Sequence, residues 1–113
     1  MNSDVDLIPL TTKAALQAAF AQEWAVVYKH SNRCWISALT IRQVRRFAKS
    51  HPETPVYQVD VIEARDLSMA LAQSVGIQHQ SPQALVVNRG RVVWHDSHFG
   101  VKAKALSEAR GGA

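Results

Sequence analysis

Cysteine is scarce in this sequence, which has a single one, Cys34, among its 113 residues. One thiol cannot form an internal disulfide, and a free thiol persists best in a reducing compartment. The chain also lacks any apolar run close to the roughly 20 residues that cross a bilayer. Its start carries Asp4 and Asp6 in place of the basic segment that opens a secretory signal peptide. We therefore expect a cytoplasmic protein with no membrane partner.

Positive charge is in only modest excess: the chain has 13 Lys and Arg and 9 Asp and Glu, for a net charge of +4. Four of the cations share one face of a predicted helix whose opposite face is apolar: Arg42, Arg45, Arg46 and Lys49. Such a pattern is typical of a solvated face, and an anionic partner is the alternative interpretation. The small excess argues against nucleic acid as a partner.

The length and composition fit one ordinary globular domain, since 47% of the residues are hydrophobic and 19% are charged. No internal repeat or linker-like stretch divides the chain. We expect a single domain over residues 1–113, with flexible ends at 1–9 and 111–113.

The order of periodic segments predicts a mixed α/β fold. Helices are expected from Thr11 or Thr12 to about 23, and over 35–49, 66–75 and 101–110; strands are expected over 24–28, 56–62, 84–87 and 91–95. Asp66 is the expected cap of the third helix, and Gly76 its end. The first two strands and the helix between them form a parallel βαβ unit, and a glycine-bearing turn at 88–90 joins the last two strands as an antiparallel hairpin. About four strands in a mixed sheet exclude an all-parallel Rossmann domain.

Cys34 stands where the first strand ends and the second helix begins. Unpaired N–H groups and the positive end of the helix dipole favour a thiolate at such a position, and Lys29 and Arg33 add positive charge nearby. The thiolate is the reactive form in disulfide exchange. A small buried apolar residue is the competing interpretation of a lone cysteine, and the junction position argues against it.

Other cysteine chemistries fit the sequence less well. A C-x5-R phosphatase loop would need arginine where Thr40 stands. A cysteine hydrolase needs a histidine base, and no local signature assigns that role to any of the histidines. A zinc site at His95 and His98 would need two side chains that an extended strand points to opposite faces. We expect no metal and no cofactor.

Disulfide exchange fits better, because Cys34-Trp35-Ile36-Ser37 has the spacing of a C-x-x-C redox motif with serine in the second cysteine's place. A hydroxyl cannot resolve a mixed disulfide, although it can hydrogen-bond to a thiolate. Ser81-Pro82 stands directly before a predicted strand, a position that proline tolerates.

The element order, the cysteine at the head of the first βαβ helix and the proline before the hairpin resemble the thioredoxin-like fold. The chain also resembles, more specifically, the YtxJ family of bacillithiol-system redox proteins, the monothiol bacilliredoxins. It covers about residues 10–108 and lies in the stretches KHSNRCWIS, VYQVDVIEARDLSMALA, GIQHQSPQALVV and GRVVWHDSH. One position departs from the family pattern, since Trp35 follows the cysteine where the family typically has proline.

The resemblance implies that Cys34 is the reactive cysteine and that Pro82 is a cis-proline facing it. It further implies a thiol-disulfide oxidoreductase that removes bacillithiol from client proteins carrying it as a mixed disulfide. Bacillithiol would then be a co-substrate, and a second thiol or a partner reductase would regenerate the cysteine. In that hypothesis Ser37 bonds the thiolate, the Ser81 backbone pairs with the disulfide partner, and Arg33 and Lys29 attract the carboxylates of bacillithiol.

A rival hypothesis is a thioredoxin-like binding module without turnover, in which Trp35 and Trp94 make the contacts.

Overall fold

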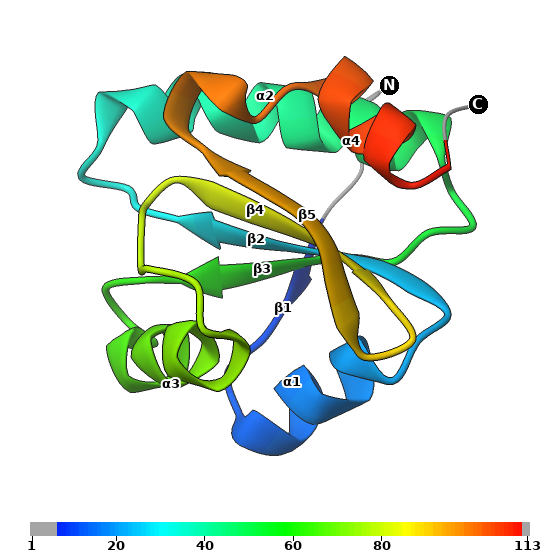
Figure 1. The fold of residues 1–113 in the computed structure, drawn as a ribbon. Coiled ribbons are helices and arrows are strands. Elements are labelled where there is room, and N and C mark those ends of the chain that lie inside the picture. Colours follow the sequence, from blue (N-terminus) through cyan, green and yellow to red (C-terminus); the bar gives the residue numbers. More distant parts are fainter. Residues whose placement is uncertain (1–6, 112–113) are drawn as a thin grey trace.

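Residues 7–111 are described by a computed structural model, in which a five-stranded mixed sheet lies between two layers of helices (Figure 1). The strands are β1 (Ile8–Pro9), β2 (Trp24–His30), β3 (Val56–Asp60), β4 (Gln83–Asn88) and β5 (Arg91–Ser97), in the spatial order β1-β3-β2-β4-β5. β3 pairs in parallel with both β1 and β2, whereas β4 is antiparallel to β2 and β5. The βαβ unit and the hairpin therefore meet at the central strand β2.

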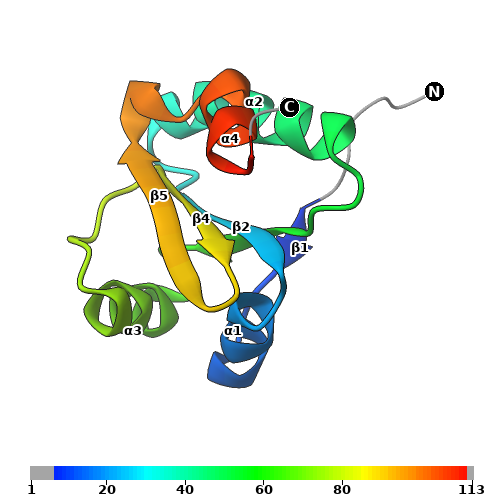
Figure 2. The same cartoon turned by 45° about the vertical axis from the view of Figure 1, so that its right-hand side comes forward.

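The helices divide between the two faces of the sheet. They are α1 (Lys13–Phe20), α2 (Trp35–Ser50), α3 (Arg65–Val75) and α4 (Ala103–Ala109), with a short 3-10 helix, η1 (His98–Gly100), before α4. α2 and α4 cover one face, and α1 and α3 cover the other (Figures 1 and 2). Within residues 7–111 no helix is long and apolar enough to cross a bilayer.

Two hydrophobic clusters fill the space between the sheet and its helices. Val26 and Tyr28 of β2 point into the cluster under α2 and α4, whereas Val27 joins the cluster that packs against α1 and α3. Because neighbouring residues of a strand point to opposite faces, an unbroken apolar strand such as β2 must be covered on both sides. The loop that carries Cys34 therefore follows directly from a strand that is packed on both faces.

The mixed α/β fold, the parallel βαβ unit and the hairpin predicted from the sequence are confirmed. The sheet has one strand more than the four expected, because Ile8–Pro9 pair with β3. The predicted flexible start includes these two residues, which the structure places in the paired strand. The rest of that prediction lies mostly outside the described residues.

The start of α3 differs from the prediction. The helix begins at Arg65, so Asp66 lies within its first turn and is not its cap. The N-cap is Ala64, which has no side-chain capping bond. Asp60, the last residue of β3, stabilises the turn before the helix, since its Oδ1 accepts from the N–H groups of Ile62 and Glu63, both at 2.9 Å. The predicted end at Gly76 is confirmed: this residue has φ +69°, the left-handed conformation that glycine adopts without strain.

Candidate active site

Cys34 is the residue at the N-terminal end of α2. Its N–H donates to the Ser31 carbonyl at 3.3 Å, and its own carbonyl accepts from the Ser37 N–H at 3.0 Å. The side chain is partly exposed and makes no capping hydrogen bond. Cys34 is thus the N-cap residue of α2, at the positive end of the helix dipole, which favours negative charge.

Ser37 is fully buried one turn into α2 and fixes the loop before it. Its Oγ accepts from the Ser31 N–H at 3.3 Å, and Ser31 Oγ in turn accepts from the Arg33 N–H at 3.3 Å. Within residues 7–111 no hydrogen bond joins the Ser37 hydroxyl to the Cys34 sulfur, so the expected contact with the thiolate is not formed in this structure. The hydroxyl shapes the loop that presents Cys34.

A buried hydrogen-bond relay lies at the end of β2, beneath the same loop. His30 Nε2 lies 3.0 Å from Asn32 Oδ1, and His30 Nδ1 lies 3.1 Å from the Tyr28 hydroxyl. An amide oxygen only accepts, so Nε2 carries the proton and Nδ1 accepts from the Tyr28 O–H. Burial lowers the pKa of His30, which agrees with a neutral ring, and burial raises the pKa of Tyr28. Sequence reasoning did not find this relay, because its members carry no motif.

The Ser81–Pro82 peptide bond is cis, as the resemblance implied. Pro82 is buried directly before β4, and its carbonyl accepts from the His98 N–H at 2.9 Å. The next residue, Gln83, pairs with Lys29 near the end of β2. The proline loop and the cysteine loop therefore lie at the same edge of the sheet, which Figure 1 shows at the left. Ser81 Oγ is buried without a hydrogen-bond partner in the described part of the chain.

Lys29 does not lie where the sequence analysis expected it. Its side chain is 0% exposed and its Nζ donates to Gln83 Oε1 at 3.2 Å. Burial lowers the pKa of this amine to about 8. The ammonium points into the protein because β2 is covered on both faces, so Lys29 cannot attract the carboxylates of a ligand. Arg33 is exposed and is left as the cation beside Cys34.

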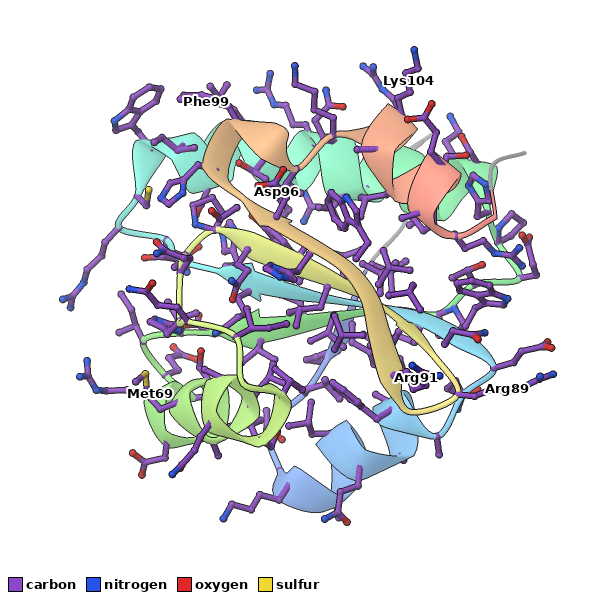
Figure 3. All side chains as sticks on the ribbon, viewed as in Figure 1. Met69, Arg89, Arg91, Asp96, Phe99 and Lys104 are labelled. Carbon is purple, nitrogen blue, oxygen red and sulfur yellow. The ribbon has the colours of Figure 1, made fainter. Side chains whose placement is uncertain are left out.

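Trp35 is 69% exposed, next to Cys34 in the chain. Its ring centroid lies 6.0 Å from that of Phe99, which is 58% exposed and comes from η1 (Figure 3). The sequence analysis named Trp35 and Trp94 as the contact residues of a binding module. Trp94 is half-buried and packs against the core under α2 and α4. Phe99 was missed because only the fold brings η1 over the start of α2.

The basic face of α2 is only partly solvated. Arg42, Arg46 and Lys49 are exposed, but Arg45 is half-buried, and its Nε has no hydrogen-bond partner within residues 7–111. Burial is the larger cause of the lowered pKa of His30, and the positive charge of Arg45 lowers it further. Residues 7–111 also contain no group of three His, Cys, Asp or Glu side chains arranged to hold a metal ion.

Comparison with known proteins places this site in a family. The sequence profile described as monothiol bacilliredoxin BrxC matches residues 8–106. The chain belongs to this family. A solved protein described as a candidate oxidoreductase with a thioredoxin fold is 30% identical to this bacilliredoxin family member, with a TM-score of 0.85 over 91% of this chain and 92% of that one.

Two thioredoxins share the fold of this family member at lower identity. Mitochondrial thioredoxin 3 from Saccharomyces cerevisiae, in its oxidised form, is 14% identical, with a TM-score of 0.74 over 92% of each chain. Oxidised thioredoxin from Plasmodium falciparum is 15% identical, with a TM-score of 0.72 over 91% of this chain and 93% of that one. The thioredoxin-like fold predicted from the sequence is confirmed, and family and fold together support a thiol redox role.

Proposed function

We propose that the protein is a monothiol thiol-disulfide oxidoreductase that removes bacillithiol from protein mixed disulfides through Cys34. The observation that carries the proposal is a single, partly exposed cysteine at the start of α2, in a chain of the monothiol bacilliredoxin family. The cis Ser81–Pro82 bond at the same edge of the sheet supports it. A reducing compartment, the cytoplasm, suits a free thiol with this task.

The exchange conserves electrons at each step. The Cys34 thiolate attacks the bacillithiol sulfur, the disulfide bond to the client breaks, and the client sulfur leaves as a thiolate that takes up a proton. Cys34 now carries bacillithiol as a mixed disulfide. A second thiol, from bacillithiol or a partner reductase, attacks this disulfide and releases Cys34.

The residues around Cys34 have distinct roles in this proposal. Arg33 attracts the carboxylates of bacillithiol, and Trp35 provides an apolar contact surface beside the sulfur. The backbone of Ser81, next to Pro82, pairs with the bound disulfide partner in the manner of an added strand. Ser37 cannot resolve the mixed disulfide, so regeneration needs an external thiol.

Mass spectrometry of the protein mixed with a bacillithiolated client tests the proposal. We expect Cys34 to gain one bacillithiol and the client to lose it when no second thiol is added. Cys34→Ser should abolish the transfer, because a hydroxyl at neutral pH is a far poorer nucleophile than a thiolate. A client that stays modified, with no adduct on the wild-type protein, would contradict the proposal.

Ser37→Cys extends the same experiment. The substitution restores the spacing of a dithiol motif, so the second thiol should displace bacillithiol from Cys34 and leave an internal disulfide. The adduct should then be short-lived in Ser37→Cys and should accumulate in the wild type. Equal accumulation in both proteins would show that position 37 does not face the reacting sulfur.

A protein-binding module without turnover is the second candidate, and the exposed Trp35–Phe99 pair favours it. Exposed aromatic pairs are typical of contact surfaces. Unchanged client binding by Cys34→Ser, together with no thiol transfer by the wild type, would favour the module.

A further inference from the structure

A groove of about 370 Å³ runs between α2 and the segment of residues 98–102. Its walls combine cationic and apolar side chains, among them Leu39, Arg42, Arg46, His98, Phe99 and Lys102. Neither the exchange chemistry nor the residues proposed for it makes use of this groove. Its two walls are joined by a hydrogen bond from the Ala103 N–H to Gln43 Oε1 at 3.0 Å.

The side chains that line the groove include three cations. Arg42, Arg46 and Lys102 all line it, whereas no acidic side chain does. The salt bridges formed within residues 7–111 lie elsewhere, at Arg89–Glu23 and Arg110–Glu53. Asp96 does not line the groove: one of its carboxylate oxygens accepts from the Ser97 N–H at 2.8 Å, and the carboxylate lies against Gly100 of the wall segment. Three like charges along one groove repel each other, and an anionic ligand would relieve that repulsion.

The groove is continuous with the surface beside Cys34. Phe99 lines the groove and also packs against Trp35, the neighbour of Cys34 in the chain. Leu39, which is 48% exposed, adds to the same apolar surface. A client bound through its disulfide at Cys34 would therefore meet first the aromatic pair and then the cations.

The distance from Cys34 to the farther cations of the groove favours a polypeptide as the occupant. Arg46 lies 12 residues after Cys34 along α2, or about 18 Å at the helical rise of about 1.5 Å per residue. A small thiol attached to the Cys34 sulfur does not extend that far. An extended peptide covers the distance with about five or six residues at about 3.3 Å each.

We infer that this groove binds an acidic segment of the client protein, about five or six residues from the client's modified cysteine. The inference rests on the proposed function and adds a substrate preference to it: an apolar residue beside the cysteine and two or more carboxylates farther along. The apolar residue would contact Trp35 and Phe99, and the carboxylates would pair with Arg42, Arg46 and Lys102.

Labelled synthetic peptides test the inference. Each peptide has its cysteine as a mixed disulfide with bacillithiol and two glutamates about five or six residues away, on the N-terminal side in one peptide and on the C-terminal side in another. Matched peptides carry glutamine in place of glutamate. The ratio of kcat/KM between an acidic peptide and its glutamine partner is the measured preference, and we expect about tenfold for one of the two directions. The ratio should fall toward one as salt rises, because mobile ions screen exposed charges.

Two triple variants with equal charge loss locate the effect. Arg42→Gln/Arg46→Gln/Lys102→Gln should lose the preference. Lys13→Gln/Arg65→Gln/Arg91→Gln removes three exposed cations that do not line the groove and should keep it. Circular dichroism of both variants checks that they fold. An equal loss in the two variants would overturn the inference, because net charge alone would then explain the preference.

The Cys34→Ser protein separates this inference from the proposed function. Fluorescence anisotropy with peptides that lack bacillithiol measures binding without exchange. If the acidic peptide binds preferentially but the wild type transfers no bacillithiol, the groove inference stands and the proposed oxidoreductase function is refuted. If the wild type accepts bacillithiol at equal rates from acidic and glutamine peptides, the proposed oxidoreductase function stands and the groove inference is refuted. The groove inference would also be refuted if the wild type shows no preference for acidic peptides and the Arg42→Gln/Arg46→Gln/Lys102→Gln variant loses affinity for free bacillithiol.

Discussion

The amine of Lys29 is a cation that the fold removes from water. Its side chain is fully buried, and its Nζ hydrogen bond within the described residues is to Gln83 Oε1. Desolvation penalises the charged form, so burial lowers the pKa of Lys29 to about 8 from an ordinary value of 10.5. The neighbouring His79 has its pKa lowered by its own burial first and by the charge of Lys29 second. Position 29 therefore imposes an electrostatic cost on the folded state at neutral pH.

Stability should rise with pH above about 8 because of Lys29. Between the folded and unfolded pKa values the unfolded chain binds the extra proton, so raising the pH favours the folded state. The total gain should be on the order of 1–3 kcal/mol. Above about 10 the trend should reverse, because burial raises the pKa of Tyr28 and the unfolded tyrosine then loses its proton first.

Lys29→Met tests this assignment by urea unfolding between about pH 8 and 9.5, inside that window. The variant should lose the rise in stability, and exposed Lys104→Met should retain it. Methionine leaves Gln83 Oε1 without its donor, at a cost of about 1 kcal/mol, so the slope is the decisive quantity and not the absolute stability. The same slope in Lys29→Met and the wild type would refute the assignment.

At the scale of elements, the end of β2 and the start of α2 act as one unit. The strand contributes Tyr28 and His30, and the loop contributes Asn32. The Ser37 carbonyl of the helix lies 3.5 Å from the Tyr28 hydroxyl, whose one proton is donated to His30. The relay ties the loop that carries Cys34 to the central strand of the sheet. Buried hydrogen bonds of this kind restrict a loop more than exposed ones do, because no water replaces them.

Tyr28→Phe should destabilise the protein by about 1–3 kcal/mol, since it leaves His30 Nδ1 buried without its donor. It should also speed hydrogen exchange at the amides of the loop before Cys34. Tyr57→Phe is the matched control, because the Tyr57 hydroxyl forms no hydrogen bond within residues 7–111 and its ring is only half-buried. Equal effects of the two substitutions on stability and exchange would show that the relay does not hold the loop.

The sequence predicted the helices and strands that have a local hydrophobic pattern. It missed those that form only through contact with residues distant in the chain. β2 and α2 were found from an apolar run and a helical period. β1 has only two residues, one of them proline, and it is a strand only because β3 lies beside it. The start of α3 was misplaced because Asp66 suits a capping position by residue type, whereas the N-cap in the fold is Ala64, which has no side-chain capping bond.

At the scale of the whole molecule, the same distinction explains what could be known of the site. Cys34 and Pro82 were found from local patterns, because one stands at the start of a helix and the other directly before a strand, as the structure shows. The burial of Lys29 could not be predicted, because it depends on residues around position 83 packing over β2. The basic groove joins segments more than 50 residues apart in the chain, Leu39 to Arg46 and His98 to Lys102. No local pattern places these segments together.

The two helical layers share one sheet, which makes a prediction about how the molecule unfolds. Val59 of β3 is fully buried in the cluster facing α1 and α3, and Val86 of β4 is fully buried in the cluster facing α2 and α4. Each Val→Ala change should cost about 2 kcal/mol, from lost apolar burial and the cavity left behind. The two sites lie on different strands and opposite faces, so the costs should add to within about 0.5 kcal/mol in the double variant.

Denaturant unfolding of the wild type, Val59→Ala, Val86→Ala and the double variant measures this additivity. A single transition with an unchanged denaturant slope is expected in all four, because β2 is covered by both layers and neither layer can keep its core without it. Two separate transitions, or a Val86→Ala variant in which only the layer of α2 and α4 unfolds, would mean that the layers are stable independently. Cys34 would then sit at the start of a helix that can detach, and its reactivity should rise with the population of that open state.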